Sequence, residues 1–165
     1  RARAACVWWA ANSAPTDKGL RMERVLVNIP SNPVFERVVR ASASELGAAI
    51  GLSSERIEDL KLAVSEAVNN AIDHGNQREA GKLVEVLFIL DSDKLEVRIS
   101  DQGAGAEALD FSRRIVEEQN LDSGMHRGFG MYLISALVDD YEVRSSQDGT
   151  VMTLRLYRKE SAHEQ

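Results

Sequence analysis

Cysteine, proline and aromatic residues are scarce in this sequence, and long apolar runs are missing. The 165 residues include one cysteine, Cys6, which excludes an internal disulfide framework and a cysteine-rich metal site. A single cysteine fits a reducing compartment, so we expect a cytoplasmic protein. No apolar run approaches the about 20 residues that a membrane-spanning helix needs, and we expect no association with a membrane.

Positive charge is also in short supply. The chain has 20 lysines and arginines against 26 aspartates and glutamates, which gives a net charge of -6. A surface that follows a phosphate backbone needs an excess of basic residues, so this balance argues against direct binding of nucleic acid. The hydrophobic fraction of 44% and the charged fraction of 28% are ordinary for a globular protein.

The two ends of the chain differ in character from its middle. The first residues combine arginines with a short apolar patch that contains Trp8 and Trp9, a faint likeness to a signal peptide. We expect residues 1–21 to be a mobile extension and residues 159–165 to be a polar tail. Residues 22–158 are long enough for a single domain with a hydrophobic core.

Hydrophobic periodicity predicts the order of the elements. Alternating apolar residues predict strands, and a 3.6-residue repeat predicts helices. Ser31 or Asn32 can cap the first helix, and Ser53 or Ser54 the second. This order predicts an α+β two-layer sandwich, in which a five-stranded, mixed but mostly antiparallel sheet carries three main helices on one face. The predicted strands are 23–29, 82–90, 94–100, 141–145 and 150–157, and the predicted helices are 33–47, 54–75 and 130–138.

Each of the first two helices has an apolar stripe that we expect to be buried. Gly47 and Gly51 are expected to mark the end of the first helix. In that helix the stripe is Val34, Phe35, Val38, Val39 and Leu46, and in the second it is Ile57, Leu60, Val64, Ala67, Val68 and Ala71.

The second helix also carries polar side chains opposite its stripe. Glu66, Asn70, Asp73 and His74 share one side at α-helical spacing, and Gly75 is expected to end the helix as its C′ residue. A carboxylate one turn before a carboxamide, followed by an imidazole one turn later, can line a polar cleft. An ordinary solvated helix face gives the same pattern, so this helix alone does not decide between the two.

Two glycine motifs follow. The motif D-x-G-x-G at 101–105 leaves a buried strand, where an ionised aspartate can accept hydrogen bonds from an exocyclic amine such as that of adenine. The motif G-F-G at 128–130 opens the last helix, where bare backbone N–H groups and the helix dipole favour phosphate. Taken singly, each motif is also compatible with an ordinary turn or loop-to-helix junction.

The order of the three motifs is more specific than any one of them. E-x-x-x-N on a helix, D-x-G-x-G after a strand and G-x-G about twenty residues later resemble the GHKL (Bergerat-fold) ATPase superfamily. The segments VSEAVNNAIDHG, SDQGAG and RGFGMYLISALVDDYEV look most like bacterial anti-sigma-factor serine/threonine kinases of the RsbW type. The likeness covers residues 23–157.

The resemblance implies an enzyme that uses ATP and Mg²⁺. Glu66 would be the general base that accepts the proton of the attacking hydroxyl, and Asn70 the Mg²⁺ ligand, although Asn69 competes on spacing alone. Residues 106–127 would form a lid, and the role of Asp73 is left open. The implied nucleotide-binding residues are Asn70, His74, Asp101, Gly103, Gly105, Arg127, Gly128, Phe129, Gly130 and Thr150.

The resemblance implies partners as well. The chain would phosphorylate an anti-anti-sigma protein of the STAS class, sequester a sigma factor and form a homodimer. The alternative is a nucleotide-gated protein-binding regulator without kinase activity, which would have no use for Glu66. A detached histidine-kinase domain is disfavoured, because the predicted helix 33–47 has no histidine.

Overall fold

The computed structural model describes residues 22–104 and 129–158. The predicted extension 1–21, lid 106–127 and tail 159–165 lie outside the described residues. So do three predicted site residues, Gly105, Arg127 and Gly128, and the side chain of Phe129.

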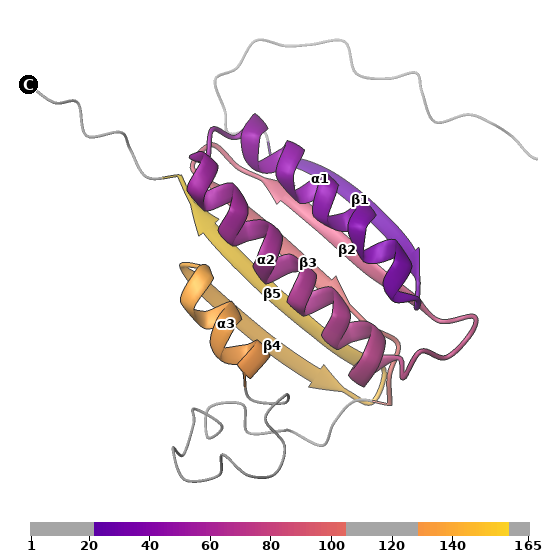
Figure 1. Ribbon diagram of the computed structural model, residues 1–165. Helices are drawn as coiled ribbons and strands as arrows, with labels where there is room; N and C mark the ends of the chain where they lie inside the picture. Colours follow the sequence, from indigo (N-terminus) through magenta and orange to yellow (C-terminus); the bar gives the residue numbers. More distant parts are fainter. Residues whose placement is uncertain (1–21, 105–128, 159–165) are drawn as a thin grey trace, which may run out of the picture.

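A five-stranded sheet forms one layer of the fold (Figure 1). Its strand order is β1-β2-β3-β5-β4, and all four pairings are antiparallel, so the parallel pairing expected in a mixed sheet is absent from the described strands. The sheet is fully antiparallel because of the position of β5. β3 and β4 run in the same direction, but β5 lies between them and pairs antiparallel with both. The strands are β1 (Glu23–Pro30), β2 (Leu83–Leu90), β3 (Lys94–Ser100), β4 (Asp140–Ser146) and β5 (Gly149–Tyr157).

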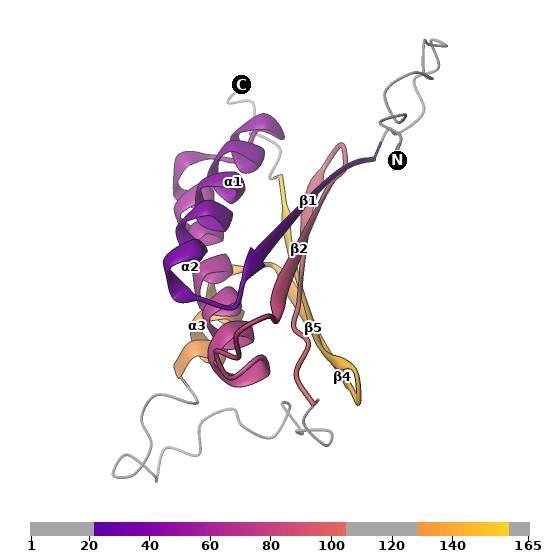
Figure 2. The ribbon, with the colours of Figure 1, turned by 90° about the vertical axis from the view of Figure 1, so that its right-hand side faces the viewer.

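The helices form the second layer, and Figure 2 shows all of them on the same side of the sheet. The short turn η1 (Pro33–Phe35) leads into α1 (Glu36–Ala49). α2 (Ser54–Asn70) continues directly into the π-helical turn η2 (Ala71–Gly75), and α3 (Phe129–Leu137) follows later in the chain. The predicted two-layer α+β sandwich is therefore confirmed. None of the helices in residues 22–104 and 129–158 combines the length and apolarity needed to cross a membrane.

Helix starts follow the predicted capping chemistry. The Asn32 side chain accepts a hydrogen bond from the backbone N–H of Val34 (3.0 Å), and the Ser53 hydroxyl accepts one from that of Arg56 (3.3 Å). Each bond satisfies a backbone N–H that has no partner within its helix. These two residues are therefore the caps among the candidates that the sequence offered.

The apolar stripe of α2 is buried as predicted, but that of α1 is buried only in part. Leu60 and Val64 are fully covered, whereas Val34 and Val38 are 56% and 47% exposed. α1 instead turns small residues toward α2. Gly47 lies inside the helix rather than at its end, and a Cβ added to it would lie 3.1 Å from Leu60. Small residues allow the two helices to approach closely, which leaves the larger apolar residues at the start of α1 on the surface.

Candidate active site

The end of α2 and the loop after β3 are in direct contact. A Cβ added to Gly75 would overlap the Asp101 carboxylate, and one added to Gly103 would overlap the carbonyl oxygen of Gly75. These glycines are therefore required for space. The contact brings the helix that carries Glu66 and the loop that carries Asp101 to one end of the sheet (Figure 1).

Asp101 is held by only one of its carboxylate oxygens. Its Oδ1 accepts hydrogen bonds from the backbone N–H groups of Gly103 (2.9 Å) and Thr150 (3.1 Å). No group in residues 22–104 and 129–158 donates a hydrogen bond to Oδ2. A half-buried carboxylate that is fixed at one oxygen and open at the other is suited to receive an N–H donor from a ligand.

The start of β5 closes the other side of Asp101. Gly149 has a φ of +131°, and a Cβ on it would overlap the Asp101 carbonyl oxygen. The backbone N–H of Asp101 donates a hydrogen bond to the carbonyl of Thr150 (3.0 Å), and the backbone N–H of Thr150 donates one to Oδ1 of Asp101. The hydroxyl of Thr150 lies 3.3 Å from that of Ser145. The structure thus brings Thr150 to Asp101 through its backbone.

The glycine motif of α3 approaches the polar face of α2. A Cβ on Gly130 would overlap Oε1 of Glu66, so the carboxylate lies beside the first turn of α3. Glu66 and Asn70 are both half-buried and lie one helical turn apart. Of the predicted site residues that are described, the structure therefore brings Glu66 and Gly130 together, and Asp101 together with Gly103 and Thr150.

The last turn of the polar helix differs from the prediction. α2 ends at Asn70, and the π-helical turn η2 is closed by a bond from the N–H of Asn76 to the carbonyl of Ala71 (2.8 Å). A π turn contains more residues than an α turn, because its hydrogen bonds join residues five apart, and it is often found at functional sites. It changes the direction of the residues after Asn70, and His74 is exposed.

Gly75 does not serve as the predicted C′ residue either. Positive φ angles occur at Gly51, Gly81 and Gly149, but not at Gly75. The prediction was wrong because a helix-terminal glycine usually marks a left-handed residue, whereas this one makes room for Asp101.

Asp73, whose role the sequence left open, forms an ion pair. The Nε of Arg78 lies 2.6 Å from Oδ1 of Asp73, and this side-chain hydrogen bond raises the pKa of Arg78. The pair offsets a negative charge next to the site. Sequence reasoning missed it because Arg78 reaches back only through an unusual turn with a φ of +56°.

A resident metal site is not built into the described chain. Within residues 22–104 and 129–158, no group of three or more His, Cys, Asp or Glu side chains is arranged to hold a metal ion. The side-chain amide of Asn70 offers one oxygen, to which phosphate oxygens and water could be added as further ligands of a cation. That mixed oxygen shell is what Mg²⁺ favours, so the donor set fits a cation that arrives with a nucleotide.

The chain is similar to proteins of one known family. Residues 29–156 match the family model described as the histidine kinase-like ATPase domain. The chain belongs to this family. It is 32% identical over 148 residues to a serine-protein kinase RsbW of Listeria monocytogenes, with 86% of this chain and 92% of that protein covered. It is also 32% identical over 136 residues to an RsbW of Bacillus velezensis, with coverage of 79% and 83%.

The fold of this histidine kinase-like ATPase is also found in a solved structure. A crystal structure of the RsbU and RsbW domains of a Mycobacterium tuberculosis protein aligns with a TM-score of 0.61 at 20% identity, covering 87% of this chain and 35% of that one. The predicted membership of the GHKL superfamily, in its RsbW branch, is confirmed by the family match and the curated relatives.

Proposed function

We propose that the protein is a serine/threonine-protein kinase and anti-sigma factor, which transfers the γ-phosphoryl group of ATP to an anti-anti-sigma partner of the STAS class. One observation supports the proposal: Glu66 lies beside Gly130 and Gly75 lies against Asp101, so the motif of α3 and the motif after β3 both contact the helical segment 66–75. The 32% identity to a serine-protein kinase RsbW over 92% of its length supports kinase chemistry.

In this proposal the nucleotide lies between α2, α3 and the loop after β3. The open Oδ2 of Asp101 would accept a hydrogen bond from the adenine amine, and the space beside Gly103 would admit the base and sugar. Backbone N–H groups at the start of α3 would bind phosphate, because they have no partner within the helix. His74, Gly105, Arg127, Gly128 and Phe129 remain predicted contacts of the same nucleotide.

Glu66 would act as the general base. It would accept the proton of a serine hydroxyl while the hydroxyl oxygen bonds to the γ-phosphorus and the bond from that phosphorus to the bridging oxygen breaks, releasing ADP. Asn70 would be the protein ligand of Mg²⁺, which offsets phosphate charge when bound. The ion pair between Asp73 and Arg78 would keep a further carboxylate from repelling the phosphates.

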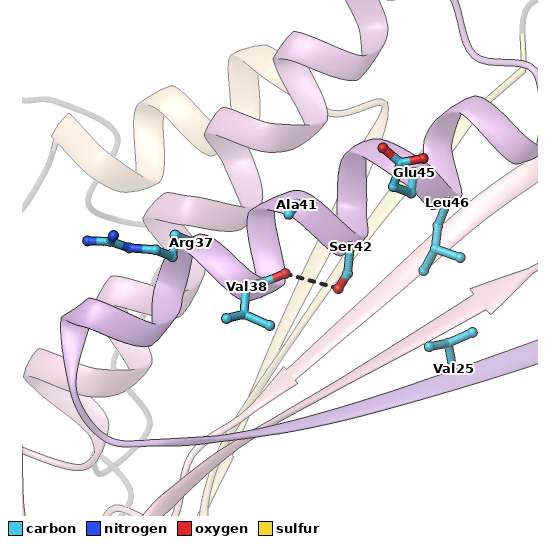
Figure 3. A pocket seen from close by; sticks show the side chains of 7 residues that line it. All are labelled: Val25, Arg37, Val38, Ala41, Ser42, Glu45 and Leu46. Atoms are coloured by element: carbon cyan, nitrogen blue, oxygen red, sulfur yellow. Dashed lines mark hydrogen bonds between the residues drawn. The ribbon is translucent and has the colours of Figure 1, made fainter.

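The proposed partners are the STAS protein, a sigma factor and a second copy of this chain, all in the cytoplasm. The surface that we assign to the second copy is a shallow groove of about 580 Å³ between β1 and α1. Figure 3 shows Val25 of β1 across this groove from Val38 and Leu46 of α1. β1 is an edge strand, so one side of its backbone is free to pair.

The charges of this groove are self-complementary. Arg37 and Glu45 lie two turns apart on α1, with the small residue Ala41 midway between them. A two-fold axis near Ala41 would place each Arg37 beside Glu45 of the partner subunit. This arrangement favours a homodimer over association with an unrelated surface.

The kinase proposal is tested with γ-labelled ATP, Mg²⁺ and a STAS protein from the same genome. We expect an acid-stable phosphate on the STAS protein, and an acid-labile product would indicate phosphohistidine instead. The Glu66→Gln variant should bind ATP but transfer at least about 100-fold more slowly, as expected for the loss of a general base. Glu55→Gln, at an exposed position of the same helix, is the matched control. Unchanged transfer in Glu66→Gln would remove Glu66 from the mechanism.

A further inference from the structure

A buried carboxamide joins three segments next to the site. Asn76 has no exposed surface, although it follows directly after η2. Its Oδ1 accepts a hydrogen bond from the backbone N–H of Gln102 (2.7 Å), and its Nδ2 donates one to the carbonyl of Leu83 (2.9 Å). Because only the oxygen can face an N–H and only the nitrogen a carbonyl, the two bonds fix the orientation of the amide.

A second side chain closes the same bridge. The Oε1 of Gln102 accepts a hydrogen bond from the backbone N–H of Leu83 (2.8 Å). The start of β2, the loop after β3 and the end of η2 are therefore linked in a closed set of three hydrogen bonds. Both residues that Asn76 contacts are held through their backbones, so the bridge fixes main-chain positions.

The turn after Asn76 is unusual. Gln77 and Arg78 have φ angles of +54° and +56°, values that residues other than glycine seldom adopt. The N–H of Arg78 bonds to the carbonyl of Ile72 (2.9 Å), and its side chain pairs with Asp73. Such conformations persist where the surrounding structure holds them, and they gather at functional sites.

We infer that Asn76 is a positioning residue for recognition of the adenine base. This inference rests on the proposed ATP site. Asn76 acts through the N–H of Gln102, which lies between Asp101 and Gly103 in the chain, so displacement of Gln102 moves both neighbours. The loop has no room to compensate, because Gly75 and Gly149 already contact Asp101. Asn76 thereby keeps the base-binding carboxylate in register with the helix that carries Glu66 and Asn70.

The experiment compares ATP and GTP affinities of the full chain by calorimetry in the presence of Mg²⁺. Asn76→Ala removes both bonds, and we expect ATP affinity to fall at least about tenfold, equivalent to about 1.4 kcal/mol, with a smaller effect on GTP. Asp101→Asn is the reference for lost base recognition and should shift the ATP-to-GTP ratio in the same direction. Asn76→Asp keeps an acceptor for Gln102 but sets an oxygen that cannot donate against the carbonyl of Leu83, so it should shift this ratio in the same direction as Asn76→Ala.

A control separates positioning from general stability. Val39 is fully buried in α1 and takes part in none of the three bonds of the bridge, so Val39→Ala lowers the melting temperature without removing a bond of the bridge. We expect Val39→Ala to retain the wild-type ATP-to-GTP ratio. Amide hydrogen exchange at Gln102 should accelerate in Asn76→Ala and not in Val39→Ala. If Asn76→Ala does not fold, Asn76→Asp alone is compared with Val39→Ala.

The outcomes distinguish the two proposals. If the wild-type chain binds ATP and the Asn76 variants keep the wild-type ratio of affinities, the positioning role is wrong and the proposed function stands. If the wild-type chain binds no nucleotide, the proposed function fails and takes the role of Asn76 with it.

Discussion

Around Asp101, three glycines make room for one carboxylate. Gly75 faces its side chain, Gly149 faces its carbonyl oxygen, and Gly103 packs on the carbonyl of Gly75. Gly75 lies at the end of η2, Gly103 lies in the loop after β3, and Gly149 is the first residue of β5. A side chain at any of these positions would have to displace backbone or the carboxylate itself. The position of the Asp101 carboxylate, the proposed base-binding group, therefore depends on these three residues having no side chain.

The Gly75→Ala variant tests this crowding. Its added methyl group would push the Asp101 carboxylate away, so we expect ATP affinity to fall at least about tenfold, or about 1.4 kcal/mol. Calorimetry with Mg²⁺ and ATP measures the change. Gly81→Ala is the control: no atom lies within 4 Å of its added Cβ, and its φ of +94° makes the variant less stable for a backbone reason alone. Equal affinity in wild type and Gly75→Ala would contradict the crowding argument.

At the scale of elements, one arginine fixes the far end of α3. The guanidinium of Arg56 donates hydrogen bonds to the carbonyl of Leu137 (3.0 Å) and to Asp139 (2.5 Å), and Asp139 also accepts one from the backbone N–H of Tyr157 (2.8 Å). A cation at the C-terminus of a helix is favourable because unpaired carbonyls gather there. α3 is thus anchored to α2 and β5 at one end, while its other end lies beside Glu66.

Removal of the Arg56 side chain should destabilise the fold. We expect Arg56→Ala to lower the free energy of unfolding by about 2 kcal/mol, because the Arg56 side chain is largely shielded from water and bonds to charged groups are strong. Urea denaturation followed by circular dichroism measures the change. Arg40→Ala removes an exposed arginine whose Nε lies 3.7 Å from Glu36, and it should cost less than about 1 kcal/mol. Similar losses in both variants would show that Arg56 does not anchor α3.

The sheet face away from the helices holds a network of charges across β3, β5 and β4. Burial opposes ionisation of Glu96, but hydrogen bonds from Arg155 and Arg98 outweigh it and lower the pKa of the Glu96 carboxyl below 4.5. The hydrogen bond from Arg144 is the largest influence on Glu142, and with Arg155 it lowers the pKa of that carboxyl as well. Arg155 links both carboxylates, at 2.9 and 3.4 Å.

This network predicts a loss of stability in acid. A carboxyl whose pKa is lower in the folded state takes up protons more readily when the chain is unfolded. Its contribution is complete above the ordinary pKa of 4.5 and is lost as the pH falls through the lower value of the folded state. We expect the melting temperature to decline below about pH 4.5, and to decline less steeply in Glu96→Gln. Glu85→Gln, exposed on the neighbouring strand, should keep the wild-type slope.

The helices and strands also show which structural features could be predicted from the sequence. The α2 stripe and the caps Asn32 and Ser53 were predictable because they depend on neighbours within one or two turns. The π turn of η2 was not, because it depends on the bonds that Asn76 makes to β2 and to the loop after β3. The buried face of α1 was predicted wrongly for a similar reason. The side of α1 that packs on α2 carries small residues rather than the largest apolar ones.

Some features of the candidate site could also be predicted from the sequence, and others could not. Glu66 and Gly130, which the sequence placed in separate motifs, do meet in space. The order of the motifs predicted that meeting only through resemblance to a family. The purpose of Gly75 and the partner of Asp73 needed coordinates, because each depends on a residue brought close by a turn or by a distant strand.

At the scale of the whole molecule, apolar residues gather on one edge. Val25 and Leu26 of β1 are 38% and 54% exposed, and Phe35 and Val38 beside α1 are 38% and 47% exposed. Of these four, Val25 and Val38 line the groove between β1 and α1. Exposed apolar clusters of this kind commonly mark interfaces between proteins.

The proposed homodimer can be tested at this edge. Val38→Asp would place a charge in the groove, and we expect the dimer dissociation constant to rise at least about tenfold, about 1.4 kcal/mol. Sedimentation equilibrium measures the constant, and circular dichroism confirms the fold. Leu62→Asp, at a 48% exposed position of α2 outside the groove, should leave the constant unchanged. A chain that is monomeric before any substitution would contradict the dimer.

The place of β5 has a consequence for how the protein is made. β5 is the last of the described strands along the sequence, yet it lies between β3 and β4 and supplies the Thr150 N–H that holds Asp101. Synthesis runs from the N-terminus, so while the ribosome is still adding Tyr157 the nascent chain has β3 and β4 with no strand to join them. The proposed nucleotide site is therefore incomplete at this stage of translation, and it cannot form before β5 has emerged.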